Sequence, residues 1–182
     1  MWFLANDEAV PEKVRAVPQK FALPRDQFEE TDGWPHELYV REGRRMISDY
    51  VMTEYDCRGT RATPDSVGLA SYTMDSHHTS RVVVEGVVKA EGNVEVAVPK
   101  PYPVSYRALV PRESECANLF VPVAVSSSHI SFGSIRMEPV FLLLGQSAAT
   151  AAAQAMDAGV PVQKVDYLKL RERLLKDGQK LD

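Results

Sequence analysis

The chain has 182 residues, of which 45% are hydrophobic and 25% charged, and its formal net charge is −4. This balance gives no indication of binding to nucleic acid or to an anionic membrane surface. No stretch approaches the roughly 20 apolar residues of a membrane span, and residues 1–16 lack the apolar centre of a signal peptide. Cys57 and Cys116 lie far apart and match neither a disulfide framework nor a zinc site. These features do not indicate a cellular compartment.

The first 53 residues are predicted to contain an irregular strap with one short helix, followed by a longer helix. Residues 1–35 contain four prolines and many charges, with one short helix expected to begin at Pro11. The next segment, "HELYVREGRRMISDYVMTEY", has apolar residues close to helical spacing. We therefore expect a helix over residues 38–53, although Gly43 weakens it.

Strands are predicted for residues 67–111. The segments "VGLASYTMD", "RVVVEGVVK", "NVEVAV" and "VSYRALV" are rich in Val, Tyr and Thr. The tripeptide "EGN" between two of them reads as a hairpin turn. An antiparallel or mixed sheet is expected here.

The C-terminal third is predicted to contain a strand, a serine-rich loop and two helices. The apolar run "NLFVPVAV", residues 118–125, is typical of a strand buried on both faces. A helix is expected over 138–158, with Pro139 in its first turn and Gly159 at its end. The last helix, at 165–177, has Asp166 as its N-cap.

The helix at 138–158 has one face with almost no side chains, formed by Gly145, Ala148, Ala149, Ala152 and Ala153. One interpretation is tight packing against a sheet. The other concerns the N-terminus of the helix, where unpaired N–H groups attract an anionic or electron-rich group. Gly133 and Ser134 precede that end.

Two polar clusters supply candidate site residues. His129 and Arg136 flank the turn before the long helix. The second cluster contains Asp75, His77, His78 and Arg81. Because adjacent histidines on an extended segment point to opposite faces, only one of this pair joins a given site. The spacing matches no zinc pattern, so no metal ligand is assigned. Each histidine also has an ordinary interpretation as a hydrogen-bonding residue.

The chain resembles the C-terminal part of the FAD-dependent oxidoreductase family, whose fold is like that of glutathione reductase. The resemblance covers roughly residues 34–182. It rests on "YVREGRRMISDYVMTE", "SVGLASYTMDSHH" and "PYPVSYRALVPRESECANLFVPVAVSSSHISFGSIRMEPVFLLLGQSAATAAA", in that order. Some relatives have names linked to polysaccharide breakdown, such as xanthan lyase.

The resemblance implies FAD as the cofactor and assigns residues to it. The strand at 118–125 would be the last strand of the FAD domain, and the following helix would point its N-terminus at the flavin ring. The flavin-side residues would be Ser134, Ile135, Arg136 and Met137. His129, and after it His77, would be catalytic candidates on the substrate side.

One feature of the family is absent from the sequence, namely the glycine-rich turn that binds the pyrophosphate of FAD. We therefore expect three parts: an N-terminal strap at 1–35, a substrate-domain-like helix and sheet at 36–117, and strand and helices of the FAD-domain type at 118–182. The N-terminal dinucleotide-binding half of the family would be missing.

Three functional interpretations follow from this division. The chain is a C-terminal portion of an oxidoreductase that is inactive alone, a cofactor-free binding domain, or a protein associated with polysaccharide degradation. The small-molecule or sugar substrate is unknown. Self-association or a missing N-terminal half would cover the exposed apolar faces.

Overall fold

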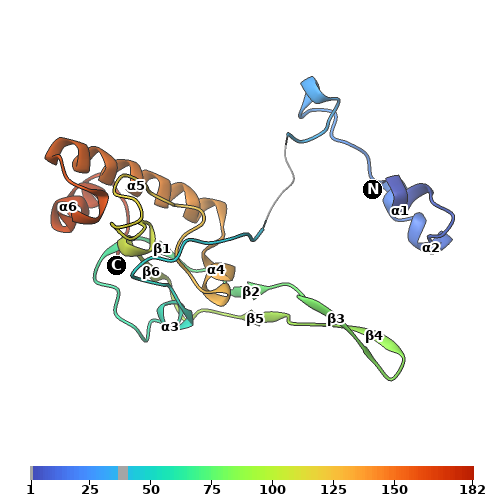
Figure 1. The fold of residues 1–182 in the computed structure, drawn as a ribbon. Coiled ribbons are helices and arrows are strands. Elements are labelled where there is room, and N and C mark those ends of the chain that lie inside the picture. The colour runs from blue at the N-terminus through green and yellow to red at the C-terminus, as the bar shows by residue number, and fades with distance from the viewer. Residues whose placement is uncertain (1, 37–40) are drawn as a thin grey trace. The chain divides into compact units, whose positions relative to one another are not determined.

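The structure, a computed structural model, describes residues 2–36 and 41–182. The chain divides into two units, Met1–Arg41 and Glu42–Asp182. Figure 1 shows the order of the elements along the chain. The prediction of a mixed α/β fold with antiparallel strands is confirmed.

The N-terminal unit contains only short helical elements: α1 (Trp2–Asn6), α2 (Glu12–Arg15), η1 (Pro18–Lys20) and η2 (Glu29–Thr31). As expected, α2 begins directly after Pro11. Only Val10 and Gly33 are buried among the described residues of this unit. Several of its large apolar side chains, including Trp2, Phe21 and Trp34, are exposed.

The second unit contains the hydrophobic core. Its elements are α3 (Glu54–Cys57), β1 (Ser66–Ala70), β2 (Met74–Ser76), β3 (Ser80–Val84), β4 (Val87–Glu91), β5 (Val94–Val96), β6 (Tyr102–Ser105), η3 (Tyr106–Ala108), α4 (His129–Ile135), α5 (Glu138–Ala158), η4 (Val162–Lys164) and α6 (Tyr167–Lys176). The strands form three antiparallel pairs, β1–β6, β2–β5 and β3–β4. The helices at the C-terminus are confirmed, with Gly159 ending α5 in a left-handed conformation and Asp166 capping α6.

The core lies between the β1–β6 pair and the helices α5 and α6. The Ser147 hydroxyl of α5 donates to the Val67 carbonyl of β1 at 2.7 Å, and the Tyr167 hydroxyl of α6 donates to the Ser66 carbonyl at 2.9 Å. Ala148, Ala151 and Ala155 are buried on α5. Part of the small-residue face is therefore packed. Another part is not, since Ala149 and Ala153 are exposed and a Cβ at Gly145 would meet no atom within 4 Å.

The helix predicted at 38–53 is wrong in its described part, because residues 41–53 contain no helical residue. Residues 38–40 lie outside the described residues. The buried residues of the segment are Ser48, Tyr50 and Met52, which alternate as in an extended chain. The Met52 N–H donates to the Ser126 carbonyl, so backbone bonds to the run before α4 replace helical ones.

The strand predicted at 118–125 is also wrong, because the structure assigns no strand there. The segment makes scattered backbone bonds instead of a ladder. The Val121 N–H donates to the Leu109 carbonyl, and the Ala124 carbonyl accepts from the Met46 N–H. Pro122 removes one donor. The serine-rich loop that was expected to follow is partly helical, since α4 forms within it.

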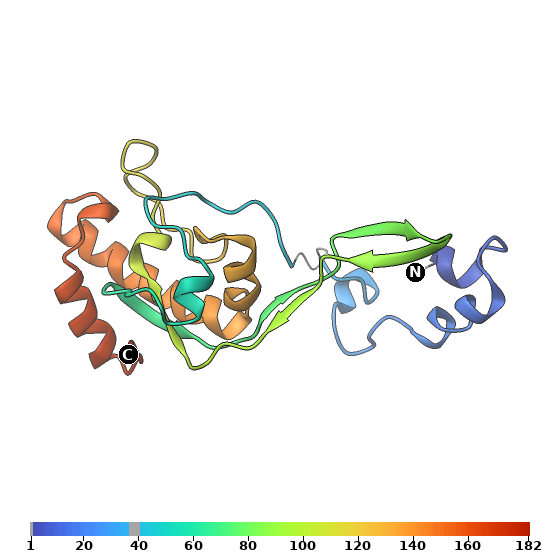
Figure 2. The ribbon, with the colours of Figure 1, turned by 90° about the horizontal axis from the view of Figure 1, so that it is seen from below.

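The hairpin turn lies at Glu85–Gly86 and not at "EGN". Both residues have positive φ, 53° and 76°, which is the type I′ turn favoured between antiparallel strands. The segment "RVVVEGVVK" is therefore a hairpin and not one strand. The β2–β5 pair continues into the β3–β4 pair, so that the four strands form one long two-stranded arm (Figures 1 and 2).

Gly133 allows α4 to approach β2 closely, and this contact predicts a stability difference between two glycine variants. A Cβ at Gly133 would lie 2.3 Å from the Asp75 carbonyl oxygen. We expect Gly133→Ala to lower the free energy of unfolding by about 1–3 kcal/mol because the backbones must separate. Gly145→Ala, in open space on α5, should raise it by about 0.5–1 kcal/mol. Urea denaturation of both variants measures these changes, and an equal effect of the two would contradict the contact.

Candidate functional site

The candidate site lies where α4 ends and α5 begins. Ser128 caps α4, its side chain accepting a hydrogen bond from the Ser131 N–H. No side chain caps the N-terminus of α5, and Pro139 occupies its first turn. The first N–H groups of a helix have no partners within that helix. The junction therefore combines backbone donors with the side chains of residues 134–137.

Two of the predicted flavin-side residues point into the protein. Ser134 and Ile135 are both 0% exposed. The Ser134 hydroxyl accepts from the Tyr102 hydroxyl at 2.7 Å and donates to the Tyr72 carbonyl. Because both residues are wholly enclosed, they support the junction from within the protein and leave contact with a ligand to the residues that follow.

Arg136 is buried and incompletely satisfied. Its residue is 7% exposed, and its terminal nitrogen donates to the Asp75 carbonyl at 3.2 Å and lies 3.6 Å from an Asp75 carboxylate oxygen. Its Nε has no hydrogen-bond partner among the described residues. A buried donor without a partner costs free energy, and an acceptor from water or from a ligand would remove that cost. Met137, the next residue, packs against the core.

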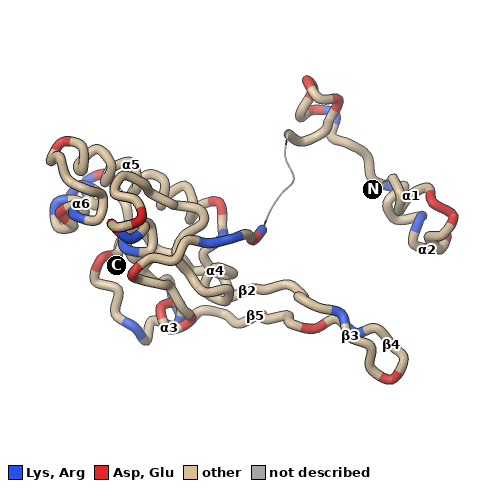
Figure 3. The backbone as a smooth tube through the Cα atoms, viewed as in Figure 1, with Lys and Arg blue, Asp and Glu red and all other residues tan. Residues whose placement is uncertain are grey.

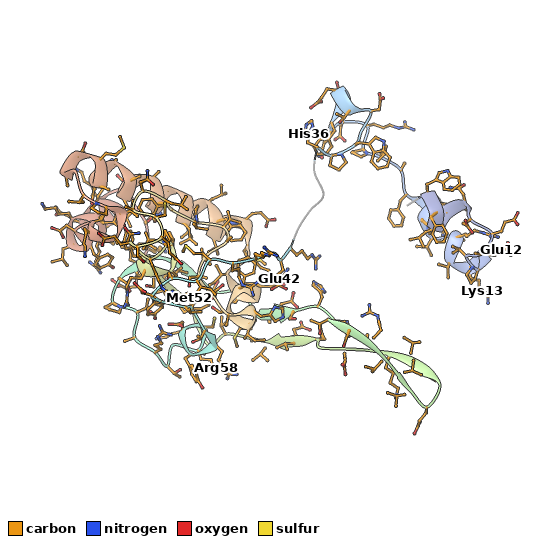
Figure 4. The ribbon with its side chains drawn as sticks, viewed as in Figure 1. Glu12, Lys13, His36, Glu42, Met52 and Arg58 are labelled. Atoms are coloured by element: carbon orange, nitrogen blue, oxygen red, sulfur yellow. The ribbon has the colours of Figure 1, made fainter. Side chains whose placement is uncertain are left out.

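His129 links three segments of the chain. Its Nδ1 lies 2.7 Å from a carboxylate oxygen of Glu42, and its Nε2 lies 2.8 Å from the Ser76 hydroxyl. Figure 4 labels Glu42, at the start of the extended segment that passes α4. The His129 side chain is 42% exposed. A carboxylate that holds one ring nitrogen fixes the orientation of the ring, an arrangement used in acid–base catalysis.

The hydrogen-bonded chain from Glu42 through His129 to Ser76 does not form an open nucleophile site. Ser76 is only 2% exposed, and its hydroxyl is also close to two backbone carbonyls, those of His77 and Gly92. A substrate carbonyl cannot reach an enclosed hydroxyl. The arrangement is therefore suited to orienting the imidazole and not to covalent catalysis.

The His77 imidazole lies near Asp75. Its Nε2 is 4.0 Å from an Asp75 carboxylate oxygen, and its side chain is 58% exposed. Asp75 thus stands between His77 and Arg136. Among residues 2–36 and 41–182, no group of three or more His, Cys, Asp or Glu side chains could hold a metal ion. Over the same residues, no helix has the length and hydropathy to cross a bilayer.

Comparison with protein families places these residues in a known group. The family described as FAD dependent oxidoreductase matches residues 5–174, which is most of the chain. The chain belongs to this family. No curated protein and no solved structure matches it.

Family membership implies FAD, and the junction fits one end of that cofactor. The unsatisfied Nε of Arg136 and the uncapped N-terminus of α5 are donors for an electron-rich ring edge. The pyrophosphate is different, because the sequence contains no Gly-x-Gly-x-x-Gly turn. The residues present therefore fit the flavin ring and not the diphosphate.

Sequence reasoning missed Glu42, Ser76 and Tyr102 as partners of the candidate residues. Glu42 and His129 are separated by 87 positions, and Tyr102 and Ser134 by 32. No local pattern connects residues at such separations. The sequence gives one weak signal for Tyr102, because it alternates with Val104 and Tyr106 as residues on the buried face of a strand do.

The Tyr102 hydroxyl beside Ser134 predicts a loss of stability at alkaline pH. Burial, and then the neighbouring Cys57 thiol, raise the pKa of Tyr102 well above its usual 10.0. Protonated Tyr102 contributes its full stabilisation of the folded chain below pH 10. This contribution is lost as the pH rises further, because Tyr102 ionises at lower pH in the unfolded chain than in the folded one. We expect Tyr102 to account for about 0.8 kcal/mol of the stability lost between pH 8.5 and 10.5.

Urea midpoints of wild type, Tyr102→Phe and Tyr55→Phe at the two pH values test this prediction. Tyr102→Phe should lose less stability between them than wild type does. Tyr55, which is exposed, serves as the matched control and should leave the pH dependence unchanged. Equal pH dependence in wild type and Tyr102→Phe would contradict the prediction.

Proposed function

We propose that this chain supplies the ring-side and substrate-side part of an FAD-dependent oxidoreductase, while a further segment or partner chain supplies the pyrophosphate-binding turn. The unsatisfied, buried Nε of Arg136 at the α4–α5 junction is the observation that supports it most. The family match supports the cofactor. When bound, FAD supplies reversible two-electron transfer.

The proposed roles of the residues follow from their contacts. Arg136 Nε and the first N–H groups of α5 would bind and orient the ring, with the enclosed Ser134 and Ile135 supporting them from within the protein. Met137 would help to exclude water. Gly133 would keep this junction seated on β2, because it allows the approach of α4 to Asp75.

His129 is the proposed substrate-side acid–base residue, and His77 is the second candidate. Glu42 holds His129 at Nδ1 and Ser76 holds it at Nε2, so a substrate would exchange a proton with Nε2 once the contact with Ser76 opens. In the flavin-loaded protein, His129→Gln should lower kcat and alter its pH profile, whereas His77→Gln should change it less. A larger effect of His77→Gln than of His129→Gln would instead assign the acid–base role to His77.

The chain alone should hold little or no flavin. Loss of the pyrophosphate contacts weakens binding by several kcal/mol, and each 1.4 kcal/mol is tenfold in affinity. The measurement is the absorbance in the flavin bands before and after addition of excess FAD and removal of unbound cofactor. A stoichiometric yellow complex of this chain alone would show that no further segment is needed.

A second arm tests the oxidoreductase proposal itself. A chain that contains a dinucleotide-binding turn of this family is added, and FAD binding is measured again. Arg136→Met should weaken the resulting binding, and Arg58→Met, at the exposed position directly after α3 (Figure 4), should not. Failure of flavin to bind in the presence of that chain would contradict the proposal.

A further inference from the structure

The outer half of the β2–β5 arm, formed by β3 and β4, exposes an apolar surface. Val83 and Val88 are 70% and 65% exposed, and Val84 and Val87 are exposed as well. An isolated two-stranded ribbon is marginally stable in water, and a third strand is usually needed. A valine-rich ribbon of this kind is therefore expected to pair with another strand.

The turn determines which backbone groups of β3 are available. In a type I′ turn at Glu85–Gly86, the Val84 carbonyl accepts from the Val87 N–H. Because hydrogen-bonding direction alternates along a strand, Val83 and Arg81 direct their N–H and C=O groups to the outer edge. Such an unpaired edge is a template for another strand.

The charges along this edge are self-complementary. Basic and acidic residues alternate along the arm (Figure 3). In the sequence, Arg81 is the second residue of β3 and Glu85 is the first residue of the turn that follows it. The guanidinium of Arg81 bonds only to the neighbouring Ser80 carbonyl, at 3.1 Å. Neither Arg81 nor Glu85 has an ion-pair partner within residues 2–36 and 41–182.

We propose that the outer edge of β3 pairs antiparallel with β3 of a second copy, about a twofold axis at Val83. This register places the two Val83 residues opposite each other and Val82 opposite Val84. It brings Arg81 of each copy against Glu85 of the other, so the ion pair forms twice. The two ribbons then make one four-stranded sheet.

Other registers and the other edge fit less well. A twofold axis at Arg81 would place two guanidinium groups opposite each other, which is destabilising. On the outer edge of β4, an axis at Val88 would set Glu85 against Glu91. An axis at Ala90 would avoid that repulsion and set Lys89 against Glu91, but it would have only alanine at its centre and Val88 opposite Gly92. The β3 edge combines valine contacts with opposite charges.

Sedimentation velocity of the full chain over a range of concentrations tests the proposal. Wild type should dimerise reversibly. Arg81→Glu and Glu85→Arg should each raise the dissociation constant by about tenfold or more, because each converts two attractions into repulsions. The double variant R81E/E85R should restore dimerisation. Val83→Lys should abolish it by placing two ammonium groups at the axis.

Lys89→Glu on β4 is the matched control and should leave the dissociation constant unchanged. The urea midpoint of each variant, measured below the dimer dissociation constant of wild type, reports on folding of the monomer, and it should not change because these side chains lie outside the core. A monomer at all concentrations would overturn the proposal. So would assembly beyond the dimer, sensitivity to Lys89→Glu, or a double variant that fails to restore the dimer.

Discussion

The close approach of α4 to β2 at Gly133 is the constraint on which the candidate site depends. A side chain at this position would overlap the Asp75 backbone. The contact places Ser134 beside Tyr102 and Arg136 beside Asp75. Through β2 it also anchors the base of the long arm to the helices. A side chain at position 133 would therefore disturb the geometry of the α4–α5 junction.

The C-terminal helices could be predicted from sequence, because their signals are local. Pro139, Gly159 and Asp166 define helix ends through properties of single residues. The conformations of residues 41–53 and 118–125 could not be predicted, because their backbone hydrogen bonds join residues far apart in the sequence. Met46 donates to Ala124, and Val121 donates to Leu109. The apolar spacing of the first was compatible with a helix, yet burial follows alternate residues. Tertiary hydrogen bonds decided both cases.

The contacts of the candidate residues could not be predicted from the sequence. The long helix after residues 134–137 was predicted correctly, and the assignment of these residues to the flavin side stays a prediction. It could not show that Ser134 and Ile135 point inward while Arg136 keeps an unsatisfied donor. The His129 contacts depend on Glu42 and Ser76, which come from distant segments. Local pattern gives residue types, whereas long-range packing determines which of them meet.

NMR of the isotope-labelled chain tests most directly whether the junction of α4 and α5 faces the flavin ring. Weak binding is detectable this way even where absorbance shows none. On addition of riboflavin up to its solubility limit, the Arg136 Nε–H resonance and the amides of residues 136–138, 140 and 141 should shift, while those of β3 and β4 should not. Shifts confined to other parts of the chain, with an unchanged Arg136 Nε–H, would contradict the account.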